Sequence, residues 1–335
     1  MDRMRSEGTP PGTLGIGVVG AGSVALRHHL PVLARQRGAE VVAIADPDAQ
    51  SLAAALALAP AARGEATHTA LLADPRVDVV AVLTPPASHA QIAIAALEAG
   101  RHVFLEKPLA ASMDDARAIA RAADEAGRVV GVGFVYRRHR LVTEALDLVR
   151  AGALGRLRSI IGTMTGAGRA DPRRGGALLD LASHHVDLWR LFTGTEVTSA
   201  HAVAGNDCAV LSARMGDGTA VSVTVGDALG ANHELRLLGD AGTITLRLDR
   251  FDGLDLVPAG ALPGDPPLRL RRGLASMRSL PAMVRSHRAG GDLSAAFAAE
   301  WRDLLSAVRG ERPFQPDASD GFLALEAILQ AEVAG

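Results

Sequence analysis

The chain has 335 residues, of which 48% are hydrophobic and 21% charged, a balance typical of a globular protein with a sizeable core. Its 35 basic and 37 acidic residues give a formal net charge of −2, so no overall basic field attracts nucleic acid or a membrane surface. The single cysteine, Cys208, excludes an internal disulfide framework and a multi-cysteine metal site. No apolar run reaches the roughly 18 residues of a membrane span, and residues 1–12 lack the apolar core of a signal peptide. We therefore expect a cytoplasmic protein of two domains.

The first third of the chain alternates short strand-like runs with alanine-rich helical stretches. Strands that alternate with helices in this way predict right-handed βαβ crossovers and a doubly wound parallel sheet. Gly38, Gly100 and Gly127 follow the predicted helices, where glycine commonly ends a helix. The predicted strands are Leu14–Val19, Val41–Ala45, Val77–Leu83, His102–Leu105 and Val129–Val132, and the predicted helices are Leu26–Arg37, Ser51–Leu58, His89–Ala99 and Met113–Ala126.

The pattern changes after Gly133. From Thr195 to Val257, β-rich runs are separated by Gly-Asp, Asp-Gly and Ala-Gly pairs, which predicts an antiparallel meander. Pro258–Gly291 is rich in Pro, Gly and Arg, and Arg269–Arg288 carries six arginines and no acid. We expect a solvated or partner-facing flap there, with contact to a phosphorylated sugar or another subunit as the alternative. The other predicted elements are helices Val142–Ala151, Ala177–Phe192, Leu293–Arg309 and Ala318–Glu332 and strands Leu157–Thr165, Ala209–Met215, Thr219–Val225, His233–Leu238 and Thr243–Leu248.

A glycine-rich turn follows the first predicted strand and opens a helix. In Gly20-x-Gly22-x-x-Ala25, Gly20 permits a tight turn, Gly22 lets the backbone approach a pyrophosphate, and Ala25 permits close helix–sheet packing. The helix N-terminus offers free N–H groups to phosphates. Asp46, at the end of the second strand, is placed to bind a ribose diol and to repel a 2′-phosphate. The sequence predicts a dinucleotide site that prefers NAD to NADP, and the alternative is a structural turn that binds nothing.

Thr84 and Pro85 end the next predicted strand, at the edge where a doubly wound sheet places its ligand. We therefore expect this turn to line the cofactor. His89, near the start of the following helix, is a further candidate contact, and the alternative is a capping or surface histidine.

The chain has one lysine, Lys107, against 34 arginines. A single lysine among so many arginines suggests a role that a guanidinium cannot fill, namely a compact ammonium that donates hydrogen bonds, reorients or titrates. The alternative is a surface lysine that remains by chance. Lys107 follows another predicted parallel strand, and Pro108 favours an extended backbone that directs it beyond the sheet edge. On a later predicted helix Asp180 and His184 are four residues apart and share one face, as in a general base with its carboxylate. The alternatives are a buried hydrogen-bonded histidine or, with Asp187, a metal site, although we expect Asp187 to serve packing.

Together these motifs resemble the Gfo/Idh/MocA family of glucose–fructose oxidoreductase and inositol dehydrogenase. The resemblance extends from Leu14 to the last helices. It implies an NAD(P)-binding Rossmann domain over 1–133 and, over 134–335, a C-terminal α+β domain for substrate binding and oligomerisation, built on a large, mainly antiparallel sheet. The motifs that carry it are Gly20-x-Gly22-x-x-Ala25, Asp46, Thr84-Pro85-x-x-x-His89, Glu106-Lys107-Pro108 and Asp180-x-x-x-His184.

The resemblance implies an NAD(P)-dependent oxidoreductase that moves a hydride between the nicotinamide and a secondary alcohol or ketone of a sugar, inositol or sugar derivative. His184 would accept the hydroxyl proton, Lys107 would hydrogen-bond the same oxygen, and Asp180 would orient the site. The alternatives are an NAD-recycling enzyme of the same fold that cleaves glycosides or epimerises, and a non-catalytic NAD-binding regulator. A homodimer or homotetramer through the C-terminal sheet is also implied.

Further candidates lie around this predicted site. Tyr136 and Arg137 follow the last Rossmann strand, where related proteins line the nicotinamide and substrate pocket. Arg169, Arg173 and Arg174 precede the Asp180 helix and are candidates for a substrate phosphate or carboxylate, with a solvated loop as the alternative. The expected site has no metal. Its residues are Lys107, Asp180 and His184 for catalysis; Gly20, Gly22, Ser23, Val24, Asp46, Thr84, Pro85, His89, Glu106 and Lys107 for the cofactor; and Lys107, Tyr136, Arg137, Arg169, Asp180 and His184 for the substrate.

Overall fold

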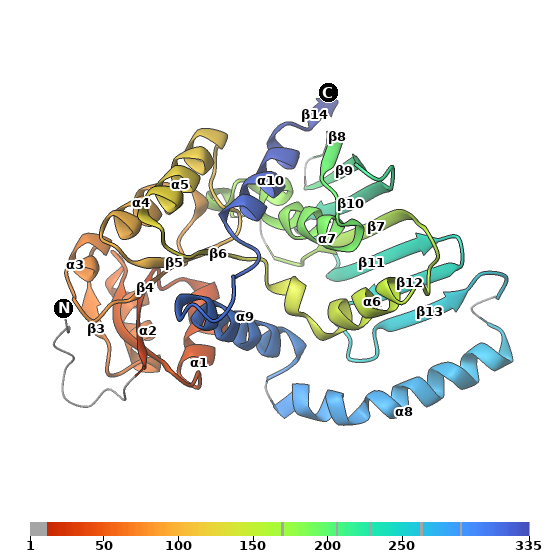
Figure 1. Ribbon diagram of the computed structural model, residues 1–335, viewed down its shortest axis with the longest axis horizontal. Helices are drawn as coiled ribbons and strands as arrows, with labels where there is room; N and C mark the ends of the chain where they lie inside the picture. Colours follow the sequence, from red (N-terminus) through yellow and green to blue (C-terminus); the bar gives the residue numbers. More distant parts are fainter. Residues whose placement is uncertain are drawn as a thin grey trace. The chain divides into compact units, whose positions relative to one another are not determined.

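The computed structural model describes residues 12–168, 171–205, 207–227, 229–261, 264–288 and 290–334. The chain forms two compact units (Figure 1): the first contains Met1–Gly133 and Phe297–Phe322, and the second contains Phe134–Ala296 and Leu323–Gly335. The chain first passes between them after Gly133, where the sequence places the domain boundary. Phe297–Phe322, which the sequence places in the C-terminal domain, packs instead with the first unit. The physical reason is aromatic packing, since the Trp301 ring lies 4.8 Å from the Phe104 ring.

The described residues of the first unit form a six-stranded parallel sheet in the order β3-β2-β1-β4-β5-β6. This is the strand order of a doubly wound dinucleotide-binding fold, which confirms the predicted parallel sheet. Helices cover both faces (Figure 1), so central strands such as β4 are buried throughout. The elements are β1 (Leu14–Val19), a π-helical turn (Ala25–His29), α1 (Leu30–Leu33), β2 (Ala39–Ala45), α2 (Ala49–Leu58), β3 (Arg63–Glu65), α3 (His68–Leu72), β4 (Val79–Val82), α4 (His89–Glu98), β5 (His102–Glu106), α5 (Met113–Ala126) and β6 (Val130–Gly133).

Local capping explains where these helices begin. The side chains of Asp48, Thr67 and Ser112 each accept a hydrogen bond from a backbone N–H in the first turn of α2, α3 and α5. Helix α5 ends at Gly127, which adopts the left-handed conformation with φ of 57°. Strand β3 and helix α3 were not predicted, because three and five residues are too few to show a hydrophobic period.

The described residues of the second unit form an eight-stranded sheet in the order β13-β12-β11-β7-β10-β9-β8-β14. It is mainly antiparallel, as predicted, although β10 pairs with β7 and β14 with β8 in parallel. The predicted meander is wrong at one connection, because β7 lies between β10 and β11. The remaining elements are α6 (Arg140–Arg150), β7 (Leu157–Thr165), a π-helical turn (Leu178–Ala182), α7 (Ser183–Thr193), β8 (Val197–Ala204), β9 (Cys208–Met215), β10 (Ala220–Gly226), β11 (Asn232–Gly239), β12 (Gly242–Arg247), β13 (Leu254–Pro258), α8 (Pro266–Arg288), α9 (Asp292–Val308), α10 (Ala318–Leu329) and β14 (Glu332–Ala334).

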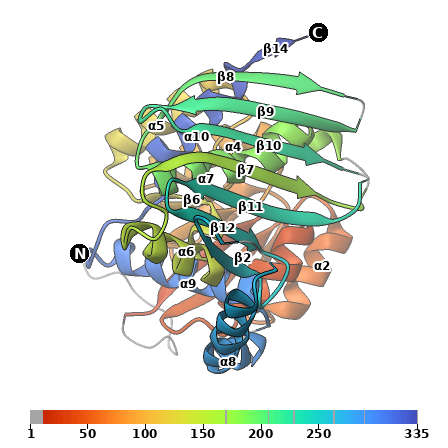
Figure 2. The same cartoon turned by 90° about the vertical axis from the view of Figure 1, so that its right-hand side faces the viewer.

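The two faces of this second sheet differ in burial. Helix α7 lies behind strands β7 to β10 when the sheet is viewed from its other side (Figure 2). Along β9, Ala209, Leu211 and Met215 are buried, whereas the alternating Val210, Ser212 and Arg214 are exposed. Ile161 and Val203 are also large apolar side chains that remain exposed, at 42% and 57%. One face therefore forms the core of the second unit, and the other is open.

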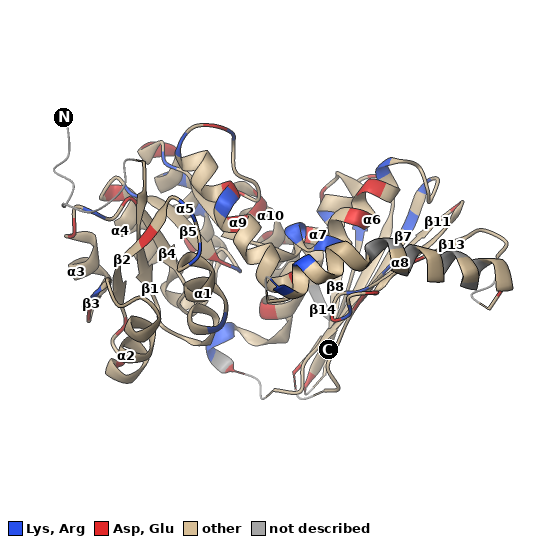
Figure 3. Ribbon diagram, turned by 90° about the horizontal axis from the view of Figure 1, so that it is seen from below, with Lys and Arg blue, Asp and Glu red and all other residues tan. Residues whose placement is uncertain are grey.

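The stretch for which the sequence predicts a solvated or partner-facing flap contains helix α8. Its 23 residues run from Pro266, a position where proline is compatible with a helix start, to Arg288, with Pro281 inside. Leu270 and Met277, at 68% and 66%, are among its exposed apolar side chains. Its last turn contains Arg285, His287 and Arg288, and Figure 3 draws arginines in blue. Within the part of the chain that the structure describes, no helix has both the length and the apolar character of a membrane span.

Candidate active site

The glycine-rich turn lies at the carboxyl end of β1. Gly20 has a φ of +97°, and an added Cβ would lie 2.7 Å from the carbonyl oxygen of Leu83, so this position requires glycine. At Gly22 an added Cβ would meet nothing within 4 Å, so internal packing does not require glycine there. The missing side chain instead keeps the backbone N–H groups accessible, as a pyrophosphate requires. Ser23 is exposed and Val24 half-buried at the start of the following helix. These features fit a dinucleotide.

Asp46 directly follows β2 and ties two loops together. Its Oδ2 accepts a hydrogen bond of 2.7 Å from the N–H of Ala21, inside the glycine-rich turn. Its Oδ1 accepts one of 2.8 Å from the N–H of Asp48. A carboxylate has about four lone-pair positions, so acceptor capacity remains on this half-buried group for a ribose diol. Asp46 therefore lies beside the glycine-rich turn, as its spacing in the sequence predicts.

His89 joins the turns that follow β4 and β5. Its ring is fully buried, with Nε2 2.8 Å from the carbonyl oxygen of Thr84 and Nδ1 3.0 Å from that of Pro108. Burial lowers the pKa of His89, and the two carbonyl contacts oppose that shift only in part. The surface position considered from the sequence is wrong. The ring instead positions the loop of Thr84 and the exposed Pro85 relative to the lysine-bearing turn.

Glu106 and Lys107 form the end of β5 and the start of its loop. The Oε2 of Glu106 accepts a hydrogen bond of 3.1 Å from the N–H of Lys107, and its Oε1 lies 2.8 Å from Nε2 of His29. The carboxylate of Glu106 is thus engaged within the protein, and Lys107 is half-buried. Because β1, β2, β4 and β5 are parallel neighbours, the residues predicted to bind the cofactor meet at one edge of this sheet.

Asp180 and His184 lie in the second unit, on the π-helical turn and on α7. Both are buried, at 8% and 6% exposure. The Oδ2 of Asp180 accepts a hydrogen bond of 3.2 Å from Nη1 of Arg174, whose side chain is half-exposed. The ring of His184 packs edge-on against that of Tyr136, with centroids 4.8 Å apart. The second unit therefore holds His184 against an aromatic ring and Asp180 against an arginine.

A cluster of buried histidines surrounds Tyr136, and sequence reasoning missed it. His233 on β11 packs against Tyr136 at 4.5 Å, and His185 lies 5.4 Å from His233. Burial lowers the pKa of His185 to about 3 and that of His139 to about 4, and it raises the pKa of Tyr136 to about 12. These rings are therefore uncharged at neutral pH. No local pattern marks His139 or His233, because only the tertiary fold brings them to Tyr136.

Arg137 is held by α7. Its guanidinium donates to both carboxylate oxygens of Asp187, with Nε 2.9 Å from each, and Asp187 is 1% exposed. Asp187 therefore packs within the unit, as expected, and a substrate contact of Arg137 stays a prediction. Arg173 is largely exposed and pairs with Asp171, which fits the solvated loop. Arg169 lies outside the described residues.

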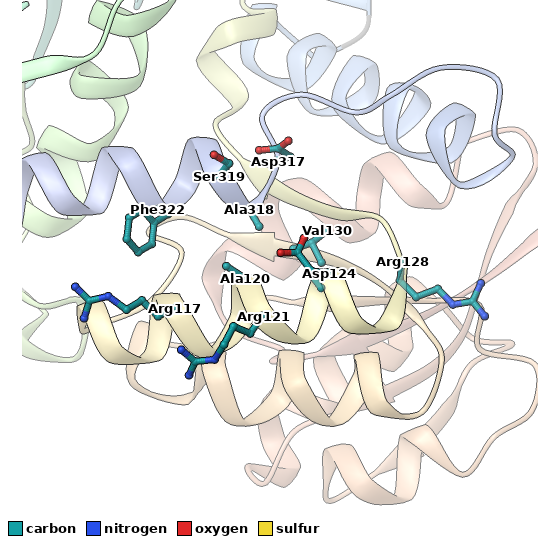
Figure 4. A pocket seen from close by; sticks show the side chains of 11 residues that line it. Arg117, Ala120, Arg121, Asp124, Arg128, Val130, Asp317, Ala318, Ser319 and Phe322 are labelled. Carbon is teal, nitrogen blue, oxygen red and sulfur yellow. The ribbon is translucent and has the colours of Figure 1, made fainter.

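A hollow of about 530 Å³ lies elsewhere in the first unit, between α5, β6 and the start of α10. The side chains of Arg117 and Arg121 extend to one side of it and that of Arg128 to the opposite side (Figure 4). None of the predicted site residues lines it. The described residues also contain no group of three or more His, Cys, Asp or Glu side chains arranged to hold a metal ion.

Two family models match most of the chain. Residues 14–134 match the GFO/IDH/MocA oxidoreductase family with an NAD-binding Rossmann fold, and residues 142–245 match the GFO/IDH/MocA C-terminal domain. The chain belongs to the Gfo/Idh/MocA family. The expected family, fold and NAD cofactor are thereby confirmed, and the protein is an oxidoreductase.

Individual members of the Gfo/Idh/MocA family show how far the similarity extends. The chain is 36% identical over 250 residues to dTDP-3,4-didehydro-2,6-dideoxy-alpha-D-glucose 3-reductase of Streptomyces violaceoruber, covering 70% of this chain and 72% of that protein. The WlbA dehydrogenase from Bordetella pertussis, solved with NADH and UDP-GlcNAcA, shares the fold with a TM-score of 0.77 at 23% identity over 96% of both chains. A levoglucosan dehydrogenase solved with NADH and levoglucosan has a TM-score of 0.78 at 23% identity, over 95% of this chain and 97% of that one. The individual roles of Lys107, Asp180 and His184 stay predictions.

Proposed function

We propose that this Gfo/Idh/MocA protein interconverts a secondary alcohol and a ketone on a sugar or sugar derivative, with NAD as the redox partner. The observation that carries the proposal is the position of Lys107. The only lysine of the chain follows β5, at the same sheet edge as the glycine-rich turn and Asp46. In a chain with 34 arginines, the one lysine thus lies at the carboxyl ends of parallel strands, where a doubly wound sheet binds its ligand.

The cofactor is proposed to bind along this edge. The N–H groups after Gly20 hold the pyrophosphate, and Asp46 binds the adenosine ribose. The negative charge of Asp46 repels a 2′-phosphate, which supports NAD rather than NADP. Thr84 and Pro85 line the cofactor from the neighbouring strand end. When bound, the nicotinamide exchanges a hydride with the carbinol carbon.

The protein's own groups handle the proton of the reacting hydroxyl. In this proposal Lys107 donates a hydrogen bond to the reacting oxygen and stabilises the negative charge that develops on it. His184 holds the proton that leaves the hydroxyl, and Asp180 favours the protonated ring. The hydrogen bond from Arg174 to Asp180 supports a fixed orientation of that carboxylate.

The substrate is proposed to be a hexose derivative, with nucleotide-linked sugars as the first class to test. Two relatives support this choice: the dTDP-sugar 3-reductase of Streptomyces violaceoruber, and WlbA, which was solved with UDP-GlcNAcA. Arg173, exposed in the loop before α7, is a cation that a diphosphate group would attract.

The open face of the second sheet supports a homodimer or homotetramer. Ile161, Val203 and Val210 are exposed apolar side chains on its strands, where a second copy would cover them. Sedimentation at micromolar concentration tests this arrangement. A dimer or tetramer supports it, and a monomer contradicts it.

The proposed activity is tested by mixing the purified protein with NAD or NADP and a panel of nucleotide sugars, free sugars, inositols and glycosides. Reduced-nicotinamide absorbance and product chromatography are followed together, with Lys107→Ala as the control. We expect reduction of NAD that is lost in Lys107→Ala. Cleavage or epimerisation without net reduction would favour the NAD-recycling alternative, and NAD binding without any turnover would favour a regulator.

A further inference from the structure

A buried chain of hydrogen bonds runs from α9 to the backbone of Lys107, all of it within the first unit. The indole Nε1–H of Trp301 donates to Nδ1 of His29 at 3.0 Å. The Nε2 of His29 donates to Oε1 of Glu106 at 2.8 Å. The second oxygen of the same carboxylate accepts the N–H of Lys107 at 3.1 Å. Trp301 and His29, which are far apart in the sequence, are thereby linked through Glu106 to the one lysine.

The chemistry of the donors fixes the direction of this chain. Indole Nε1–H can only donate, so Nδ1 of His29 must be the acceptor. The ring proton of the neutral imidazole therefore sits on Nε2, which points at Glu106. Each nitrogen of His29 then has one partner of the correct kind, and the tautomer is set by Trp301.

Packing holds the three side chains in place. His29 and Trp301 have no solvent exposure, and Glu106 is 8% exposed. The ring of Phe104 lies edge-on to His29 at 5.4 Å and 4.8 Å from Trp301. Opposite the carboxylate, an added Cβ at Gly133 would lie 3.2 Å from Cδ of Glu106. The carboxylate therefore has little room to turn.

His29 occupies the last position of the π-helical turn that follows the glycine-rich loop. An extra residue in a helical turn rotates the following side chains, and such turns recur at functional sites. Here the turn is followed at once by α1, and its last side chain points inward to β5 rather than to solvent. Residues 20–29 thus carry both the glycine-rich turn and the contact to Glu106.

We propose that His29 and Trp301 are positioning residues for Lys107. They hold the carboxylate of Glu106 so that it fixes the Glu106–Lys107 peptide, and this peptide sets the direction in which the lysine side chain leaves the strand. The kinetic consequence rests on the proposed function, whereas the effect on the lysine itself does not. A purely structural role for the same contacts is the competing explanation.

The unique lysine makes the proposal measurable without substrate. Lys107 is the only side-chain amine, so trace acetylation at several pH values, read by mass spectrometry of its peptide, reports its reactivity alone. The variants are Trp301→Phe, which keeps an aromatic ring but removes the N–H, and His29→Phe, which removes both nitrogens. His29→Gln is the rescue variant, because its amide can accept from Trp301 and donate to Glu106.

The matched control is His28→Phe. His28 neighbours His29 on the same turn and stacks on Phe297 at 4.9 Å, but it is outside the hydrogen-bonded chain. We expect at least a threefold change in the labelling rate of Lys107 in Trp301→Phe and His29→Phe, with wild-type behaviour in His28→Phe. In His29→Gln most of the wild-type rate should return. In turnover assays the first two variants should lose at least tenfold in kcat, with the Kd for NAD changed less than twofold.

Different failures have different meanings. Folded Trp301→Phe and His29→Phe proteins that are less stable but keep wild-type lysine labelling and kcat would overturn the proposal in favour of a structural role. A His28→Phe protein that changes the labelling as much as His29→Phe would also overturn it. If the wild-type protein turns over no sugar but the labelling changes as expected, the proposed function fails and the positioning role stands.

Discussion

The ion pair between Arg137 and Asp187 gives a sharp prediction about the helix that carries His184. Asp187→Asn keeps the shape of the side chain and removes its charge. The carboxylate it replaces is 1% exposed and accepts from Nε of Arg137 at 2.9 Å on both oxygens. Arg137 itself is 12% exposed, so the variant removes the negative charge that Asp187 holds against a nearly buried guanidinium.

The magnitude follows from burial. Removing one partner of a buried ion pair destabilises a protein by roughly 3–5 kcal/mol. Asparagine retains one oxygen acceptor, so we expect a loss of about 3 kcal/mol in the free energy of unfolding. For a domain of this size that corresponds to a fall in Tm of roughly 6–12 °C. The pair of Arg158 and Asp240, 54% and 50% exposed, provides the comparison, because a solvent-screened surface ion pair contributes little to stability.

The assay is thermal unfolding followed by tryptophan fluorescence. The chain has two tryptophans, and Trp189 is buried on α7, so a Trp301→Phe background makes the emission report the second unit. Asp187→Asn should lower the midpoint by several degrees more than Asp240→Asn in that background. Equal midpoints in the two variants would refute the claim that this ion pair anchors α7.

Three further predictions concern pH, packing and the cofactor. Burial lowers the pKa of His139 to about 4 and of His185 to about 3 from the ordinary 6.5, so only the unfolded chain binds these protons between pH 6.5 and 4. The free energy of unfolding should therefore fall as pH falls through that window, by up to about 1.4 kcal/mol per pH unit for each ring. Urea titrations at pH 7, 6 and 5 should show that this free energy depends less on pH in His139→Gln than in wild type. An unchanged pH dependence would contradict the lowered pKa of His139. In Gly162→Ala the new Cβ would clash with Nδ1 of His185, so the free energy of unfolding should fall by about 1–3 kcal/mol. Gly166→Ala, whose Cβ would meet no atom within 4 Å, should lose less in the same titration. Gly22→Val should keep its Tm within a few degrees, since nothing lies near its Cβ, but bind NAD at least tenfold more weakly by calorimetry; wild-type affinity would mean that the turn does not hold the cofactor.

Features encoded locally were predictable from the sequence. The length of a βαβ unit is nearly constant, so the interval from Gly20 to Asp46 already placed the carboxylate beside the glycine-rich turn. Lys107 could be placed at a strand end because the strand-like run His102–Leu105 and the following Pro108 mark the end of β5. Such signals depend on neighbours in the chain, which the sequence shows directly.

Features that depend on long-range pairing were not predictable. The insertion of β7 between β10 and β11 leaves each strand's alternation unchanged, so no local pattern distinguishes it from a meander. His233 is one histidine on a strand, and its contact with Tyr136 exists only once β11 is paired. The packing of Trp301 on Phe104 is also a long-range contact, so the grouping of Phe297–Phe322 with the first unit was not predictable for the same reason.

The central claim is that the one lysine of the chain takes part in the redox reaction. The most direct measurement compares wild type with Lys107→Arg, which keeps the positive charge but not a compact ammonium. On the best substrate of the panel, we expect kcat to fall at least 100-fold while the Kd for NAD changes less than threefold. Turnover by Lys107→Arg at the wild-type rate would contradict the account.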